Sequence, residues 1–147
     1  RIAAKYGLEK IKTIGDSYMC VCGLPIVTAD HAYKTVVAAL EMQEFIENRR
    51  LEREKKGQTF FEMRCGIHSG PVVAGVVGVN KFQYDIWGDT VNLASRMESS
   101  GEVGQVNISE TTYNLVKDKI TCTYRGEVKA KNKGMINMYF AEAVIEA

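Results

Sequence analysis

The longest periodic segment of the chain runs from residue 30 to residue 56. Its apolar positions are spaced four, three, three and four residues apart, which is the period of one helix face: Ala32, Val36, Ala39, Met42 and Ile46. The pattern therefore predicts a long helix with one buried face. Gly57 follows a run of charges of mixed sign and is a suitable C-terminal cap.

Short β-favouring runs predict strands on both sides of this helix. Residues 9–14 and 17–22 flank Gly15-Asp16, which favours a hairpin with a carboxylate in its turn. Residues 61–67 alternate apolar and polar side chains, the period of a strand with one buried face. Further strands are expected at 72–77, 82–87, 105–108, 121–129 and 135–143, with a turn at 132–134 between the last two.

Two shorter helices are expected among these strands. One begins at Asp89 or Thr90, either of which could cap it, and ends near Ser99. The other is capped by Ser109 and ends at Val116. Strands interspersed with helices, without a repeat or a linker, indicate one domain of the α+β class, an α/β sandwich of sheet and helix layers.

Composition excludes several kinds of partner. The 147 residues are 46% hydrophobic and 25% charged, which is typical of a globular protein. A net charge of +1 offers little attraction for a nucleic-acid backbone or an anionic membrane. The richest apolar run, residues 72–79, is far shorter than the ~18 residues of a membrane span. We expect no nucleic-acid partner and no membrane contact by this segment.

The four cysteines do not form a C-x-x-C pair, so neither a zinc site nor a redox pair is indicated. Cys20 and Cys22 would share one face of a strand as buried free thiols. Free thiols favour a reducing compartment, and we expect a cytoplasmic location for this domain.

Taken one at a time, the polar candidates carry little information. Asn92 and Arg96 fall together on the polar face of the helix that follows Asp89, where a solvated face is the commoner explanation. The same holds for Lys12 and Asp16 around the first hairpin turn, and for Lys131 near the last turn. His31 and His68 lack the spacing of metal ligands, and no G-x-x-x-x-G-K-[ST] phosphate loop is present.

The order of the segments is more informative than any single residue. They are KIKTIGDSYM (10–19), RCGIHSG (64–70), YDIWGDTVNLASRME (84–98), RG (125–126) and KNKG (131–134). Together they strongly resemble the catalytic domain of class III nucleotidyl cyclases, over nearly the whole chain. The segment 84–98 is the most specific of the five.

The resemblance implies a ferredoxin-like cyclase fold with a mainly antiparallel sheet and helices packed on it. It also implies a head-to-tail dimer with active sites at the interface, here a homodimer or a heterodimer with another cyclase domain. The family's first strand, with the first of two metal-binding aspartates, lies upstream of the first hairpin. Residues 1–147 are therefore expected to be a partial catalytic domain that lacks the first strand and early helices, and to be inactive alone.

The resemblance also implies roles for particular residues. Asp16 would be the second aspartate that holds two Mg²⁺ or Mn²⁺ ions, in a different site from Lys12. Lys12 and Asp85 would read the base. Adenine offers an acceptor at N1 and a donor at N6, which suit a lysine donor and an aspartate acceptor, whereas guanine reverses both. ATP is the expected substrate.

The remaining roles concern the ribose and the phosphates. Asn92 would hold the ribose and α-phosphate region, and Arg96 would stabilise the transition state. Lys131 would grip the triphosphate; a register shift of two would give this contact to Lys133. The expected reaction converts ATP to 3′,5′-cyclic AMP and pyrophosphate. The alternatives are a guanylyl or relaxed-specificity cyclase, and a non-catalytic dimerisation or nucleotide-sensing module.

Overall fold

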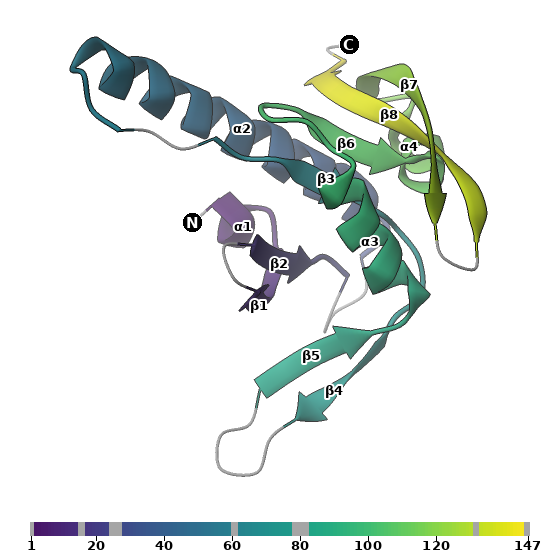
Figure 1. Ribbon diagram of the computed structural model, residues 1–147. Helices are drawn as coiled ribbons and strands as arrows, with labels where there is room; N and C mark the ends of the chain where they lie inside the picture. The colour runs from purple at the N-terminus through teal and green to yellow at the C-terminus, as the bar shows by residue number, and fades with distance from the viewer. Residues whose placement is uncertain are drawn as a thin grey trace.

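The computed structural model describes residues 2–14, 17–23, 28–59, 62–77, 83–130 and 133–145 (Figure 1). The elements, in chain order, are α1 (Ile2–Lys5), β1 (Glu9–Ile14), β2 (Ser17–Val21), α2 (His31–Lys55), β3 (Cys65–Ile67), β4 (Val73–Val77), β5 (Gln83–Trp87), α3 (Asp89–Ser99), β6 (Val106–Ser109), α4 (Glu110–Val116), β7 (Ile120–Ala130) and β8 (Gly134–Val144).

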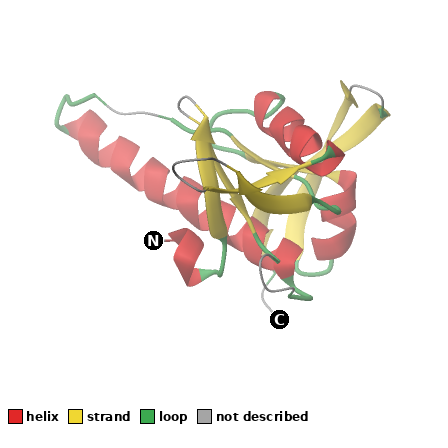
Figure 2. Cartoon of the chain, turned by 90° about the horizontal axis from the view of Figure 1, so that it is seen from below, coloured by secondary structure: helices red, strands yellow, loops and turns green. Residues whose placement is uncertain are grey.

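The largest sheet has the strand order β3-β6-β8-β7. The β3–β6 pair is parallel, and the β6–β8 and β7–β8 pairs are antiparallel. β1 with β2 and β4 with β5 form two separate antiparallel hairpins. The expected α+β sandwich with a mainly antiparallel sheet is confirmed, and Figure 2 shows helices on more than one side of the strands.

Alternation along the central strands assigns the helices to opposite faces of this sheet. Ile67 of β3 and Ile108 of β6 join the core cluster that includes Val36 of α2 and Val116 of α4. Their strand neighbours Gly66 and Asn107 point to the other face, because successive side chains alternate. There α3 packs, and Asn107 Nδ2 donates to the Met97 carbonyl at 2.9 Å. The sheet therefore separates α2 and α4 from α3.

The contact between α3 and β3 requires a glycine. An ideal Cβ built at Gly66 would lie 2.0 Å from the Glu98 backbone nitrogen and 2.4 Å from its Cα. These are backbone atoms of α3, which cannot rotate away as a side chain can. Gly66 thus sets how closely α3 approaches the sheet.

Gly66→Ala should destabilise the domain by about 3 kcal/mol, because the added methyl must push the helix backbone off the sheet. Urea unfolding monitored by circular dichroism measures the change. Gly75→Ala is the matched control, since its Cβ would meet only the Trp87 ring, at 3.4 Å. A Gly66→Ala domain as stable as the control would contradict this packing.

The first hairpin forms a smaller core with α1. Ala3 and Leu8 are buried there against Ala38 of α2, and Cys20 and Cys22 pack on the same cluster. All four cysteines are free and half-buried. Cys20 and Cys22 were expected as buried thiols on one strand, but β2 ends at Val21, before Cys22. Burial raises the pKa of the Cys20 thiol to about 11, so this thiol is a packing group rather than a nucleophile.

Several expected boundaries differ from the structure. The strand expected from residue 61 begins at Cys65, because its pairing partner in β6 begins opposite, at Val106. The residue before α3 is Gly88, which has no side chain to cap the helix, and Thr90 Oγ1 donates instead to the Pro71 carbonyl. The short helix α1 was not expected from the sequence pattern.

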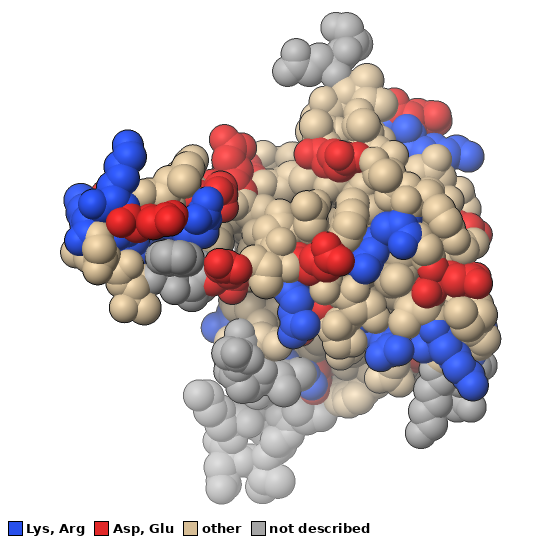
Figure 3. Space-filling model, turned by 45° about the horizontal axis from the view of Figure 1, so that its top comes forward, with Lys and Arg blue, Asp and Glu red and all other residues tan. Residues whose placement is uncertain are grey.

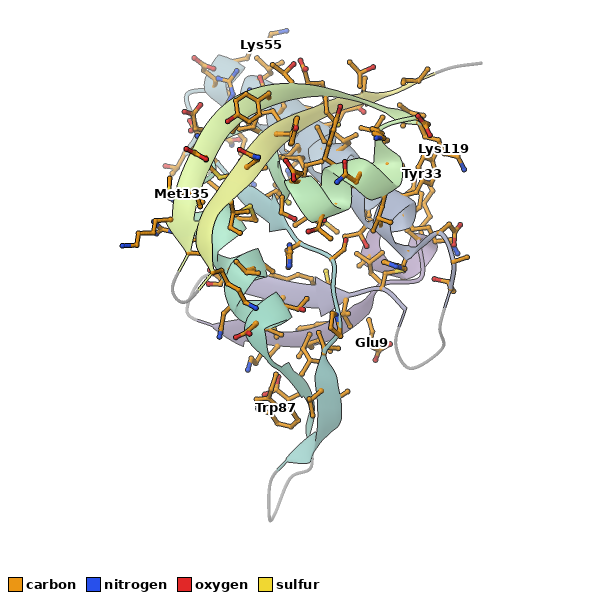
Figure 4. All side chains as sticks on the ribbon, turned by 90° about the vertical axis from the view of Figure 1, so that its right-hand side faces the viewer. Glu9, Tyr33, Lys55, Trp87, Lys119 and Met135 are labelled. Atoms are coloured by element: carbon orange, nitrogen blue, oxygen red, sulfur yellow. The ribbon has the colours of Figure 1, made fainter. Side chains whose placement is uncertain are left out.

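The β4–β5 hairpin extends away from the rest of the fold, as Figures 1 and 4 show from two directions. Its exposed apolar side chains include Val73, 66% exposed, and Trp87, 40% exposed. These two residues are cross-strand partners, so they form one apolar patch. Among the described residues, no helix is both long and apolar enough to cross a membrane.

Candidate active site

Lys12 and Asp85 are 73 residues apart in sequence and meet in the structure. Lys12 Nζ donates to Asp85 Oδ2 at 2.9 Å. The contact forms because β1 packs against β5. The pairing register of β1 shifts between Lys10 and Lys12, an irregularity of the kind that re-aims side chains. The two residues expected to read the base are thus brought together by one chain.

Asp85 is held in a fixed orientation. Its Oδ1 accepts the backbone N–H of Ile86 at 2.8 Å, while Oδ2 faces Lys12. The hydrogen bond from Lys12 is the main cause that holds the pKa of Asp85 below its ordinary value. Asp85 is therefore an ionised acceptor at neutral pH, with a lysine donor beside it.

Asn92 and Arg96 lie on the exposed side of α3, four residues apart. Leu93 and Met97 are buried on its opposite side, as the periodicity predicted. Within the part of the chain that is described, neither the Asn92 amide nor the Arg96 guanidinium has a hydrogen-bond partner. Both side chains are therefore available to a ligand or to a second protomer.

Arg125 of β7 is a residue that the sequence pattern did not single out by itself. Its Nη1 donates to the Ser100 carbonyl at 2.7 Å, at the C-terminal end of α3. Its guanidinium also lies 4.4 Å from the centre of the Phe140 ring. The phrase Arg125-Gly126 was the only signal in the sequence, and it does not specify a contact with a helix 25 residues upstream.

The opposite end of α3 also contacts the β7–β8 hairpin. Lys133 Nζ lies 3.2 Å from Asp89 Oδ2, at the first residue of α3. Lys131 itself, the expected triphosphate ligand, lies outside the described residues. Lys133, the alternative ligand, has a carboxylate partner within its own protomer.

Asp16, the expected metal ligand, also lies outside the described residues. Its neighbour Ser17 donates to Glu98 Oε1 at 3.4 Å, and Glu98 also pairs with Arg64 at 3.2 Å. No group of three or more potential metal-ligating side chains occurs in the described ranges.

Two polar side-chain contacts join the segment after β3 to the start of α4. His68 Nδ1 is 2.6 Å from Ser109 Oγ, and Ser69 Oγ is 2.9 Å from Thr112 Oγ1. Burial, and next the charge of Lys133, hold the pKa of His68 below its ordinary value. His68 is thus a neutral partner for Ser109 at neutral pH, which is a structural role.

Comparison with known proteins places these features in a family. Residues 1–143 match the model of the adenylate and guanylate cyclase catalytic domain. An adenylate cyclase of Mycobacterium tuberculosis is 41% identical over 136 residues, which are 92% of this chain and 30% of that protein. The chain therefore spans less than a third of this curated relative.

Two solved structures share the fold closely. The guanylate cyclase domain of RhGC from Catenaria anguillulae, in complex with GTP, superposes with a TM-score of 0.87 at 37% identity. The alignment covers 98% of this chain and 77% of that one. The catalytic core of a rhodopsin-guanylyl cyclase with converted specificity, in complex with ATPαS, gives 0.85 at 39% identity, covering 97% and 75%. The chain belongs to the adenylate and guanylate cyclase catalytic domain family, whose members generally depend on divalent metal ions.

Proposed function

We propose that this domain converts ATP to 3′,5′-cyclic AMP and pyrophosphate at the interface of a head-to-tail dimer. The observation that carries the choice of ATP is the Lys12–Asp85 pair, in which a donor and an acceptor stand side by side at 2.9 Å. Both side chains are mostly buried, at 29% and 12% exposure, so little water competes with a bound base for their hydrogen bonds.

The pair has hydrogen-bonding capacity left for a base. The ammonium of Lys12 retains further N–H groups, and the carboxylate of Asp85 retains free lone pairs. Adenine can accept from Lys12 at N1 and donate to Asp85 from N6. Guanine would present a donor to Lys12 and an acceptor to Asp85, and each mismatched group costs about 1 to 3 kcal/mol. The pair therefore favours adenine.

The exposed face of α3 supplies the groups for the transfer step. The 3′-hydroxyl of the ribose gives its proton to water and its oxygen bonds to the α-phosphorus; the P–O bond to the β-phosphate breaks, and pyrophosphate leaves with its electrons. Arg96 would offset the charge that develops on the phosphate, and Asn92 would orient the ribose. Asp16, with an upstream aspartate, would hold two Mg²⁺ or Mn²⁺ ions; such ions activate the hydroxyl and neutralise the polyphosphate.

Exposed apolar surface supports the dimer. Val73 and Trp87 form an exposed apolar patch on a hairpin that projects from the domain, where a second protomer could cover it. One chain carries Asp16, expected on one side of each site, as well as the residues expected on the other side: Lys12, Asp85, Asn92 and Arg96. A homodimer would therefore build two equivalent sites, and a heterodimer with a related domain could build at least one.

The domain is proposed to be completed by an upstream segment. The chain aligns with about three quarters of each of these two solved chains, at 77% and 75% coverage. In the described part of the chain, β2 pairs only with β1 and β3 pairs only with β6, so each has a free edge for a further strand. That strand would bring the first metal aspartate.

The test is nucleotide turnover by the complete catalytic domain with Mn²⁺ or Mg²⁺. We expect cyclic AMP from ATP, with kcat/KM for GTP lower by about 30-fold or more. Residues 1–147 alone should give no cyclic nucleotide. Preferential turnover of GTP would support a guanylyl cyclase instead. Nucleotide binding without turnover of either triphosphate would support the sensing module.

A further inference from the structure

Arg125 stands at a β-bulge of β7. The pairing register of β7 with β8 shifts between Tyr124 and Gly126, and Arg125 is skipped. Gly126 has a φ of 116°, which a glycine adopts without the strain that a side chain would cause. A bulge of this kind re-aims a side chain. It gives the Arg125-Gly126 phrase of the sequence a structural reason.

The Arg125 guanidinium is held by a ring, a carbonyl and a carboxylate. It lies 4.4 Å from the centre of the Phe140 ring. Its Nη1 donates to the Ser100 carbonyl at 2.7 Å, and its Nη2 lies 3.9 Å from Glu102 Oε1. A guanidinium suits this place because its donors lie in one rigid plane that also stacks on a ring. The side chain, 18% exposed, therefore fastens β7 to the end of α3.

Ser100 connects Arg125 to the backbone of Arg96. Its N–H donates to the Arg96 carbonyl at 2.9 Å, while its own carbonyl accepts from Arg125. The last carbonyls of a helix have no partner within the helix. The Gly104 N–H, four residues after Ser100, donates to the Met63 carbonyl instead. Arg125 thus caps α3 four residues after Arg96.

Asn107 of β6 holds the same turn of α3 from inside. Its Nδ2 donates to the Met97 carbonyl at 2.9 Å, and the residue is fully buried. Asn107 is also the cross-strand partner of Phe140, the ring against which Arg125 lies. The last turn of α3 is therefore attached to the sheet from two strands, β6 and β7, which lie on either side of β8.

We propose that Arg125 is a positioning residue for Arg96: it fixes the last turn of α3 and so directs the Arg96 guanidinium at the reacting phosphate. This rests on the proposed function. The exposed Arg96 side chain has no partner in the described part of the chain, so the backbone of α3 sets its position. A displacement of about 1 Å in a reacting geometry can cost about 100-fold in rate.

The experiment measures kcat and KM for ATP with the complete enzyme and with Arg125→Met, which keeps an apolar stem on Phe140 and removes the donors. We expect kcat to fall about 5- to 20-fold and KM to stay within about twofold, because Asn107 still holds part of the turn and Arg96 acts mainly in the transition state. Arg125→Lys keeps the charge but not the planar fork, so it should recover part of the loss.

A double substitution separates this role from a purely structural one. If Arg125 acts through Arg96, Arg125→Met should change kcat by less than about twofold once Arg96 is alanine. If Arg125 only stabilises the fold, the same factor should be lost in both backgrounds. Radiolabelled ATP keeps the slow rates measurable, and circular dichroism at the assay temperature measures the folded fraction.

The matched control is Arg53→Met. Arg53 Nη1 also donates to a backbone carbonyl, that of Thr59 at 3.2 Å, beyond the end of α2 that projects away from α3 in Figure 1. This variant should leave kcat and KM unchanged.

Equal losses of kcat in the two backgrounds, a rise in KM in place of a fall in kcat, or a fully active Arg125→Met enzyme would each overturn the inference alone. Should Arg125→Met fail to fold, Arg125→Lys in the same two backgrounds decides by the same criteria. A wild-type enzyme that turns over neither ATP nor GTP would overturn the proposed function and this inference with it. Turnover of GTP in place of ATP leaves the same variants as the test, since Arg125 acts at the end of α3 and not at the base.

Discussion

Replacing Arg96 with alanine in the complete enzyme should lower kcat about 100- to 1,000-fold and leave KM for ATP nearly unchanged. The physical reason is that the contact between Arg96 and the phosphate is strongest in the transition state. A guanidinium aimed at the phosphate gains most as negative charge shifts toward the leaving pyrophosphate, so it stabilises the transition state more than the bound substrate. Steady-state kinetics separate the two parameters.

The structure supports this assignment through what Arg96 lacks. Its side chain is exposed and has no ion-pair partner in the described ranges, although Glu98 lies two residues further along α3 and is paired with Arg64. The Arg96 guanidinium makes no hydrogen bond or ion pair that would stabilise the described part of the fold. Removing Arg96 should therefore cost activity without lowering the melting temperature.

Two variants sharpen the test. Arg96→Lys keeps the charge but not the planar fork, so it should recover only part of kcat. Arg49→Ala removes another exposed arginine, at the projecting end of α2 where Figure 3 shows charges of both signs, and should have no effect. If Arg96→Ala raised KM in proportion to any loss in kcat/KM, Arg96 would be a ground-state ligand rather than a transition-state group.

The double substitution Lys12→Glu with Asp85→Cys should change the preference of the enzyme from ATP to GTP. Cyclases of this family that use GTP typically carry Glu and Cys at these two positions. The exchange reverses the hydrogen-bond polarity of the pair. Two mismatched groups at about 1 to 3 kcal/mol each correspond to about 30- to 25,000-fold in the ratio of the two kcat/KM values.

The single substitutions test whether the two residues act as a pair. Lys12→Glu alone places a second carboxylate beside Asp85. The two like charges repel each other and leave no donor for a base, so turnover of both nucleotides should fall. Lys10→Glu is the control on the same strand, because Lys10 lies over the exposed Tyr18 ring instead, at 5.6 Å. An unchanged preference for ATP in the double variant would show that the base binds elsewhere.

Much of the fold could be predicted from local patterns. The long helix α2, the first hairpin, the apolar side of α3 and the two long C-terminal strands all follow from periodicity within a few residues. The errors fall where pairing decides the boundary. β3 is only three residues long because it pairs with β6 only over Cys65–Ile67. Before it, the Met63 carbonyl accepts instead from the Gly104 N–H and from Gln43 Nε2.

The site could be predicted only in part, and for a related reason. Resemblance to a family named six residues, and the structure describes four of them: Lys12, Asp85, Asn92 and Arg96. It brings Lys12 and Asp85 into contact and leaves Asn92 and Arg96 exposed on α3. Which residues hold α3 in place was not visible in any pattern, since the contacts of Lys133 and Arg125 link distant segments.

The sequence by itself determined the class of fold, the order of its elements and the family. Helix and strand periods depend on residues only a few positions apart, so the order of residues is enough to predict them. Only the tertiary structure decided which polar groups meet. Such contacts depend on how β1 packs against β5 and how α3 packs on Gly66, where a displacement of about 1 Å makes or breaks a hydrogen bond.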